Sequence, residues 1–450
     1  MRQRVALAFL FVLVLLAAHA VWDYVETRRF FAVIDEMRRR GEPVSRDALG
    51  RWERPTDDEE IRAARYYNAA GELAFRDWVL PPERLPGTDA RRKASADVDA
   101  ISKTGALPDD VATRLGLLAE EYSEALDMVD RAAPLRFSRF APHGFEDYPR
   151  TYSLEALDTA CSARTLRLAF ETSDDRAGQS LWSCLRLRRA HVRPSVTPIR
   201  PLLVQLRLIV ERTRPSSSVL AQLQETFGDR ERPNAIEQDI KERTALLIES
   251  ALAELYGTPT DPLVPAANSL WTWRPVVSPS RPWLLHQLTS SLREQQRILV
   301  MASQPWPAKL RDLETLSDAT PPLPQRLTPN RTVGLVWYSR YLPRMLAPST
   351  AATVLALTRT AQGILAVERY RRDNGRPPSS FGEVVPSYIK VWPQDPFSGA
   401  PLLYRVEGSG FSVYSVGSNG KDDGGEFEPL TGVAGQNTKD VGLTIRHQEK

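Results

Sequence analysis

The chain has 450 residues, which is too long for a single hydrophobic core and fits two or three domains. Apolar residues make up 42% and charged residues 26%, which excludes a disordered chain, a collagen-like fibre and a multi-span membrane protein. The 59 basic and 56 acidic residues leave a net charge of +3, too small for a general nucleic-acid-binding protein. Two cysteines and five histidines leave little material for a zinc site or a thiol enzyme.

The N-terminus carries a targeting or anchoring segment. Arg2 and Arg4 precede an apolar run from Val5 to Trp22. A basic start followed by such a run occurs both in cleaved signal peptides and in uncleaved signal anchors. Ala18-His19-Ala20 has the small-x-small form of a cleavage site. Residues 1–22 are therefore predicted as a signal anchor or a signal peptide.

Two features favour the anchor over the cleaved peptide. The apolar run is about 18 residues long, near the lower limit for a membrane-spanning helix, and Trp22 and Tyr24 would lie at the membrane surface. A helical pattern then continues to Arg40 without a small-residue break, carried by Phe30, Phe31, Val33, Ile34 and Met37. We expect a juxtamembrane helix over residues 23–45. A core helix of a soluble domain is less favoured, because terminal core helices seldom lack charges throughout.

The same residues predict where the protein lies in the cell. Arg2 and Arg4 would hold the N-terminus in the cytoplasm. The expected location is the cell membrane, crossed once, with the bulk of the chain periplasmic or extracellular.

Residues 46–262 are predicted to form an α-helical domain. Apolar side chains recur at helical spacing after Asp57 and again after Asp109. Further helical patterns cover residues 152–171, 177–190, 198–213, 234–256 and 282–301, and prolines separate most of them. No strict repeat period is present, so we expect paired antiparallel helices rather than a regular solenoid.

The two cysteines fit this helical organisation. Cys161 and Cys184 flank Thr172-Ser173-Asp174-Asp175, the expected turn between two helices. Residues equidistant from the turn of an antiparallel hairpin face each other, and exported compartments are oxidising, so a disulfide is geometrically feasible. The alternative is a pair of buried free thiols that pack as small apolar side chains.

A Trp- and Pro-rich helical segment is predicted over residues 263–347. Its tryptophans are Trp271, Trp273, Trp283, Trp306 and Trp337. Such aromatic density usually belongs to a core, and the alternative is a ligand groove or a partner surface.

The pattern changes over residues 348–450, where we expect a small α+β domain. Ser349 or Thr350 can cap a long helix that ends at Asn374-Gly375. Two short strands at 402–406 and 411–416, joined by a Gly-rich turn, predict a hairpin, and 441–445 is a candidate last strand.

The order of these motifs resembles the C-terminal domain of the major pseudopilin of type II secretion systems. The matching stretches are residues 370–377, 388–389, 393–397, 414–421 and 440–442. The resemblance covers less than a quarter of the chain and implies a long helix that carries a small antiparallel sheet. The whole chain also resembles large uncharacterised membrane-anchored envelope proteins of environmental bacteria, a resemblance that implies no activity.

One departure from the pseudopilin pattern bears on function. A pseudopilin has its processing site directly before its long apolar helix, which can then stack into a fibre. Here the N-terminus lacks a Gly-Phe-type junction, and the helix before the module is internal, near residue 350. A fibre subunit is therefore an alternative, and not the favoured, interpretation.

The pseudopilin resemblance also implies a calcium site in the last loop. By that resemblance the Val416 carbonyl, Asn419 and Asp440 occupy ligand positions, and the nearby oxygen donors are Ser418, Asp422 and Asp423. The family usually has Asp in place of Asn419 and a second acid in place of Lys439, so calcium affinity should be lower here. The alternative is a plain turn in which Asn419-Gly420 supplies positive φ.

The sequence contains no nucleophile elbow, Walker loop, dinucleotide fingerprint or zincin helix. The basic stretch 186–193 is expected to be a solvated face, with contact to anionic lipid or cell-wall polymer as the alternative. An enzyme is therefore not favoured, although an exported enzyme with a site in the Trp-rich 265–345 region is a rival hypothesis.

The combined prediction is a mainly α protein with an N-terminal membrane anchor helix, an antiparallel helical middle domain and a small C-terminal α+β pseudopilin-like domain. The leading functional hypothesis is a non-enzymatic, envelope-anchored binding or scaffolding protein associated with secretion or fibre machinery. Its expected partners are the membrane, through the N-terminal helix, and an envelope protein of unknown identity, with no nucleic acid. Calcium is a candidate cofactor, and the plain turn is the alternative.

Overall fold

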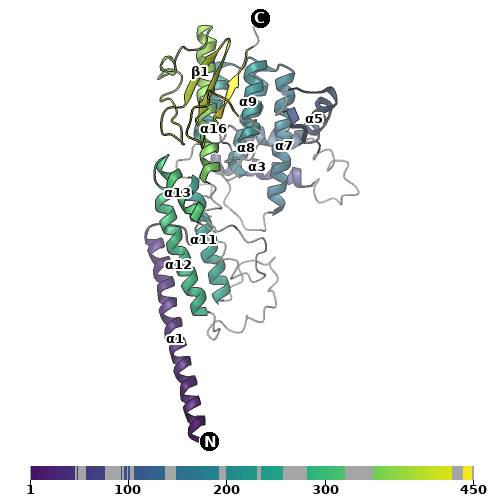
Figure 1. The fold of residues 1–450 in the computed structure, drawn as a ribbon. Coiled ribbons are helices and arrows are strands. Elements are labelled where there is room, and N and C mark those ends of the chain that lie inside the picture. Colours follow the sequence, from purple (N-terminus) through teal and green to yellow (C-terminus); the bar gives the residue numbers. More distant parts are fainter. Residues whose placement is uncertain are drawn as a thin grey trace.

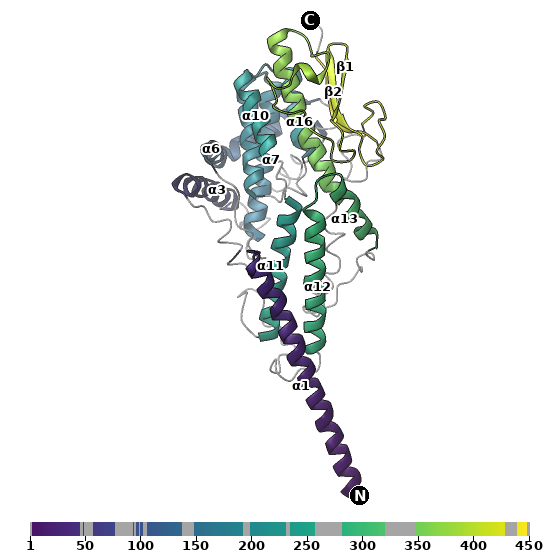
Figure 2. The ribbon, with the colours of Figure 1, turned by 90° about the vertical axis from the view of Figure 1, so that its left-hand side faces the viewer.

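The computed structural model shows an elongated, mainly helical molecule (Figure 1). It describes residues 2–45, 48, 57–76, 93, 96–98, 100–101, 106–136, 148–191, 199–230, 235–256, 281–319, 348–427 and 439–447. A long N-terminal helix leads into a narrow group of helices, above which lie the remaining helices and a small sheet (Figures 1 and 2). The predicted fold class, mainly α with an N-terminal apolar helix and a small C-terminal antiparallel sheet, is confirmed.

Helix α1 runs unbroken from Arg2 to Arg39. Its second half packs beside α12 (Arg281–Ala302), and α12 packs in turn against α11 (Ala235–Tyr256). We call the second half of α1 together with α11 and α12 the stalk. The first half of α1 extends alone beyond the other two helices in both views (Figures 1 and 2).

The stalk forms because each helix contributes one apolar stripe to a shared core. From α1 the buried residues are Phe30, Val33, Ile34 and Met37. From α11 and α12 they are Leu247, Ile248, Ala251, Leu255, Leu284, Leu285, Leu288 and Leu292. The pattern that extended the helical prediction towards Arg40 is therefore the packing face of the stalk.

The remaining helices of the first two-thirds of the chain form the body. They are α3 (Asp58–Arg76), α5 (Asp109–Glu121), α6 (Ser123–Ala132), α7 (Tyr148–Phe170), α8 (Asp174–His191), α9 (Arg200–Arg212) and α10 (Ser217–Arg230). α7 and α8 form the expected antiparallel hairpin, with Thr172 at a positive φ of 54° in the turn. At the start of α3, Asp57 accepts a hydrogen bond of 2.9 Å from the backbone N–H of Glu60, which caps the helix.

Two helices were missing from the sequence prediction, and one was divided. α10 follows Pro215 and a run of serines that resembles a loop, but Ser216 begins the helix by accepting the Leu220 N–H at 3.1 Å. α13 (Ala308–Ala319) follows the Pro305 and Pro307 pair. The pattern after Asp109 divides at Tyr122, which links α5 to α6.

The C-terminal module consists of α16 (Pro348–Asn374), a short 3-10 turn at Phe381–Glu383 and three strands. The strands are β1 (Leu403–Glu407), β2 (Gly410–Ser415) and β3 (Val441–Ile445), paired antiparallel in the order β1-β2-β3. Leu403 pairs with Tyr414 in one ladder and Phe411 with Ile445 in the other. Gly375 has a φ of 72°, so the predicted left-handed exit from the helix is confirmed.

The core is continuous across residue 348. One cluster of buried apolar residues includes members of α3 and α5–α10 together with α16, β2 and β3, and the partly buried Tyr404 of β1 packs against it. α16 lies against α10, and β3 lies against α9. Polar contacts follow the same seam: Gln224 Nε2 donates to the Tyr388 carbonyl at 2.9 Å, and the Arg446 N–H donates to Glu211 at 2.9 Å. The C-terminal module is thus packed into the body along one face of α16.

This shared core predicts that the body and the C-terminal module unfold together. Phe227 on α10 is fully buried in the shared cluster. Phe227→Ala should lower the free energy of unfolding by about 3–5 kcal/mol, because it leaves a cavity. Hydrogen exchange followed by mass spectrometry should then show faster exchange both in α10 and in β1–β3.

Glu225→Ala provides the matched control, because Glu225 is an exposed residue on the same helix. It should leave exchange unchanged in both regions. Retained protection of the three strands in the Phe227→Ala protein would contradict a shared core.

Candidate functional site

The first half of α1 is the strongest candidate for a functional surface. Residues 3–39 are long and apolar enough to span a membrane, and the most apolar window is entirely exposed. Its exposed apolar side chains include Val5, Leu7, Phe9, Leu10, Phe11, Val12, Leu13, Val14, Leu15 and Leu16. No body or stalk element covers this run, so a soluble environment would leave it in water. A lipid bilayer would satisfy it.

A cluster of polar groups lies where the apolar run ends. Asp23 forms an ion pair with Arg281 at the start of α12. Glu26, which is 3% exposed, pairs with Arg29 at 2.9 Å, and its other oxygen lies 3.4 Å from His286 Nδ1. The two helices are therefore held side by side at this level by charge as well as by apolar packing.

The upper end of the stalk is closed by a second polar contact. Gln296 on α12 accepts from Arg40 at 2.9 Å and donates to Glu42 at 2.8 Å. Residues near 23 thus pair with residues near 281, and residues near 40 with Gln296. α1 and α12 therefore run parallel, and both begin at the end of the stalk that is nearer the exposed apolar run.

In the basic stretch 186–193, Arg186 and Arg188 hold neighbouring segments of the body together. Arg188 is buried and paired with Asp158, with one contact of 2.6 Å. Arg186 donates through Nε to the Ala133 carbonyl at 3.0 Å and through a second nitrogen to the Leu135 carbonyl, at the end of α6. The expectation of a solvated face was wrong for these residues, because each guanidinium reaches an acceptor on a neighbouring segment.

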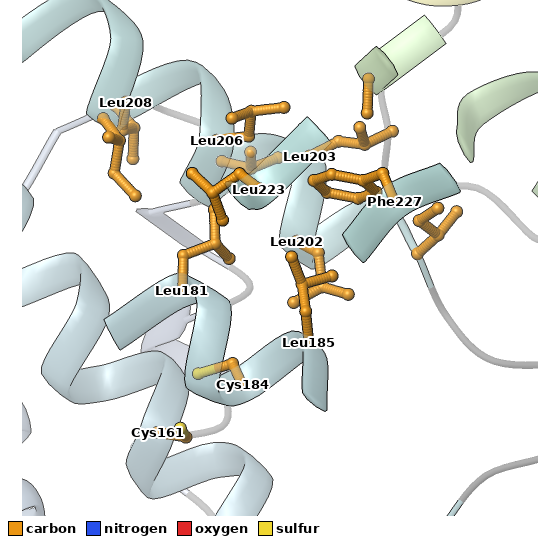
Figure 3. Packing of buried hydrophobic residues seen from close by; sticks show 14 of the residues in the cluster. Cys161, Leu181, Cys184, Leu185, Leu202, Leu203, Leu206, Leu208, Leu223 and Phe227 are labelled. Carbon is orange, nitrogen blue, oxygen red and sulfur yellow. The ribbon is translucent and has the colours of Figure 1, made fainter. Parts of the chain in front are cut away.

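Cys161 on α7 and Cys184 on α8 face each other across the hairpin, as their equal distance from the turn predicts (Figure 3). Both are buried and present as free thiols. The contact with Cys184, together with burial, raises the pKa of the Cys161 thiol well above its usual value. Thr165 lies next to the two cysteines. Its hydroxyl is 2.8 Å from Ser180 Oγ and 3.5 Å from Cys184 Sγ. The disulfide stays a prediction, since the facing geometry suits a bridge and a thiol pair alike.

We expect the two thiols to be oxidised in the protein as the cell makes it, if the body is exported. Protein purified without reductant and alkylated after denaturation should then show no free thiol and should gain two labels after reduction. Cys184→Ser is the control and should expose one alkylatable thiol under both conditions. Two labels on the wild-type protein that was denatured and alkylated without reduction would support the buried-thiol alternative.

The predicted calcium loop is closed by internal hydrogen bonds. Asp440 is fully buried, and its Oδ2 accepts from the Gly425 N–H at 2.8 Å and the Asp423 N–H at 3.1 Å. The Tyr414 hydroxyl donates to Asp422 at 3.2 Å. Asn419 donates to the Asp423 carboxylate at 2.8 Å. Three carboxylates are therefore neighbours, with Asp440 innermost.

The predicted calcium ligands lie in a hydrogen-bonded loop of the described residues. No group of three or more metal-ligating His, Cys, Asp or Glu side chains occurs among the residues that the structure describes. The Val416 N–H is bound to Asp395 at 3.0 Å, Ser418 is exposed, and Asn419 Oδ1 accepts the Lys421 N–H at 2.9 Å. Lys439 pairs with Glu426 at 2.9 Å at the rim of the loop. Calcium binding stays a prediction.

The charge of Asp440 predicts a measurable pH dependence. Burial raises the pKa of its carboxyl, and the negative charges of Asp422 and Asp423 add to this, while the Gly425 and Asp423 N–H groups oppose it. A raised pKa means that this residue favours the fold below the unfolded-state value of 3.8 and loses that contribution as pH rises through the folded value. As pH rises from 3.8 through the folded-state pKa, the free energy of unfolding of the wild type should fall relative to that of Asp440→Asn. The fall should be at most about 1.4 kcal/mol per pH unit.

Chemical denaturation of both proteins from pH 3 to pH 7 would measure this difference, and acid effects common to both would cancel. A flat difference would contradict the assignment. The same measurement at neutral pH with calcium and then with chelator tests the predicted site. Saturating calcium at a hundred times its dissociation constant stabilises by about 2.7 kcal/mol, and Asp440→Asn should abolish that gain.

A buried carboxylate on α16 was missed by the sequence analysis. Glu368 is fully buried and paired with Arg371 at 2.8 Å, Arg372 at 2.7 Å and His447 at 3.2 Å. Burial alone would raise the pKa of Glu368, but these three neighbours lower it to about 2. The charged group therefore favours the fold above pH 4.5, and this contribution is lost as pH falls towards 2. The Glu-x-x-Arg-Arg spacing was the available signal.

Of the five tryptophans of the predicted 263–347 segment, the structure describes two. Trp306 packs at the edge of the apolar cluster between α12, α13 and α16, and Trp283 is exposed on the first turn of α12. Trp271, Trp273 and Trp337 lie outside the described residues. An open hollow of about 570 Å³ lies elsewhere, where α1 ends, and is lined by Arg38, Glu42, Ser45 and Leu252 among others.

Comparison of this chain with known protein families, with curated proteins and with solved structures gives no match.

Proposed function

We propose that this chain is a non-enzymatic binding or scaffolding protein anchored in the cell envelope by α1. The observation that carries the proposal is the division of α1 into two halves with opposite surroundings. The first half is apolar and exposed, and the second half is buried in the stalk. A helix of this kind connects a bilayer rigidly to a folded body, because no loop interrupts it between Arg2 and Arg39.

The unbroken helix favours an anchor over a cleaved signal peptide. Cleavage after Ala20 would cut inside α1, nearly three turns before its first fully buried side chain, Phe30. The ion pair of Asp23 with Arg281 and the buried Glu26 lie directly after the cut. Retention of residues 1–20 keeps these groups within a continuous helix, and their hydrogen-bonded geometry then does not depend on a frayed terminus.

The proposed orientation places the body on the outer side of the membrane. Arg2 and Arg4 precede the apolar run and support a cytoplasmic N-terminus. The two facing thiols of the hairpin are suited to the oxidising side.

Association with secretion or fibre machinery rests on the pseudopilin resemblance of the C-terminal module. A long helix that carries a small antiparallel sheet supports this part of the proposal. The module lies at the end of the molecule opposite the N-terminus (Figure 2), where an envelope partner would meet it away from the bilayer.

Membrane fractionation followed by crosslinking tests the proposal. Full-length protein should stay in the membrane pellet after an alkaline carbonate wash, and its intact mass should include residues 1–20. A variant that lacks residues 2–22 should be released to the soluble fraction. Crosslinking of intact cells and affinity purification should recover a reproducible envelope partner with the full-length protein only.

Each part can fail separately. A mature N-terminus at Val21 would overturn the anchor. A chain that is firmly anchored but yields no stable partner would overturn the scaffold role, and it would leave the membrane attachment intact.

A further inference from the structure

The first turn of α12 lies beside the end of the membrane-spanning run. Arg281 pairs with Asp23, and His286 lies 3.4 Å from Glu26. Trp283 sits on α12 between these two paired residues. Since α1 and α12 run parallel, the height of Trp283 along α1 falls between those of Asp23 and Glu26.

This height can be compared with the dimensions of a bilayer. The run from Val5 to Trp22 is about 27 Å long at 1.5 Å per residue, slightly shorter than the hydrocarbon layer of about 30 Å. A bilayer thins locally around a run that is slightly too short, so the edge of the hydrocarbon layer lies close to Trp22. Trp283 lies about 2–6 Å beyond Trp22, and the interfacial layer is roughly 5–7 Å thick on each side. Trp283 consequently falls within the headgroup layer.

The surroundings of Trp283 fit that layer. Its side chain is 45% exposed, although its chain neighbours Pro282 and Leu284 are buried. Arg281, two residues earlier, forms the ion pair with Asp23. Trp22 and Tyr24 on α1 are exposed by 43% and 60%. Arg28 donates to the Tyr24 hydroxyl at 3.2 Å. Indole and phenol rings favour the bilayer interface, where the ring is in a less polar layer and its N–H or O–H stays hydrated.

We propose that the first turn of α12 is a second membrane contact, in which Trp283 inserts into the phospholipid headgroup layer beside Trp22 and Tyr24. The inference rests on the proposed membrane anchor. Two helices then meet the bilayer, so the stalk stands at a set angle, whereas a single anchor helix can tilt. The ion pair between Asp23 and Arg281 positions the second contact at the height of the first.

Quenching of a fluorophore by headgroup-labelled lipid tests this contact in the full chain. Single cysteines are introduced as Trp283→Cys, Trp22→Cys and Val300→Cys and labelled with NBD, with the wild type as the blank for its two buried thiols. Val300 is the matched control, because it is 66% exposed on the same helix and about 25 Å farther from the membrane. The proteins are reconstituted in phosphatidylcholine vesicles that carry a nitroxide at the headgroup.

Quenching at position 283 should approach that at position 22 and exceed that at position 300 by about threefold or more. Position 283 equal to position 300, with position 22 quenched, would overturn the second contact and leave the anchor standing. Absence of quenching at position 22 would overturn the anchor itself. All three sites are exposed, so thermal melts of the labelled proteins should match the wild type and confirm that the folds compared are the same.

Discussion

The packing of the second half of α1 against α12 is the contact on which the rest of the architecture depends. Through this contact, the apolar first half of α1 is joined to the folded part of the chain by a continuous helix. Four apolar side chains of α1 are buried there, and the Asp23–Arg281 pair fixes the register at the lower end. Because a helix transmits position and angle along its length, the place where the apolar run ends also determines how far the body stands from a bilayer.

Above the stalk, the body and the C-terminal module share one core because α16 has apolar or small residues around most of its circumference. Such a helix must be covered on several sides, and β2 and β3 cover only one of them. α9 and α10 cover others. The buried Glu368 and its arginine partners show that polar groups within this region are matched in charge rather than exposed. The C-terminal module is thus held in one orientation relative to the body.

Two chemically suggestive clusters lie within this framework, and both are internally satisfied. The loop around Asp440 gathers three carboxylates but meets the innermost one with backbone N–H groups. The facing cysteines are joined by a seam of hydroxyls that includes Thr165 and Ser180. Cation binding in the first case and oxidation in the second both stay predictions.

The sequence alone was sufficient for the apolar anchor, most helices, the α16 exit at Gly375 and the last strand at 441–445, because each depends on local periodicity or on a single turn residue. It also predicted that Cys161 and Cys184 face each other, since a hairpin relates residues by distance from its turn. The partners of Arg186, Arg188 and Asp23 were not predictable, because each lies on an element remote in sequence. Only the tertiary structure decided which helix stands beside α1, and so which tryptophan lies level with the end of the apolar run. Packing between distant segments is set by the complementarity of whole faces, which local patterns do not encode.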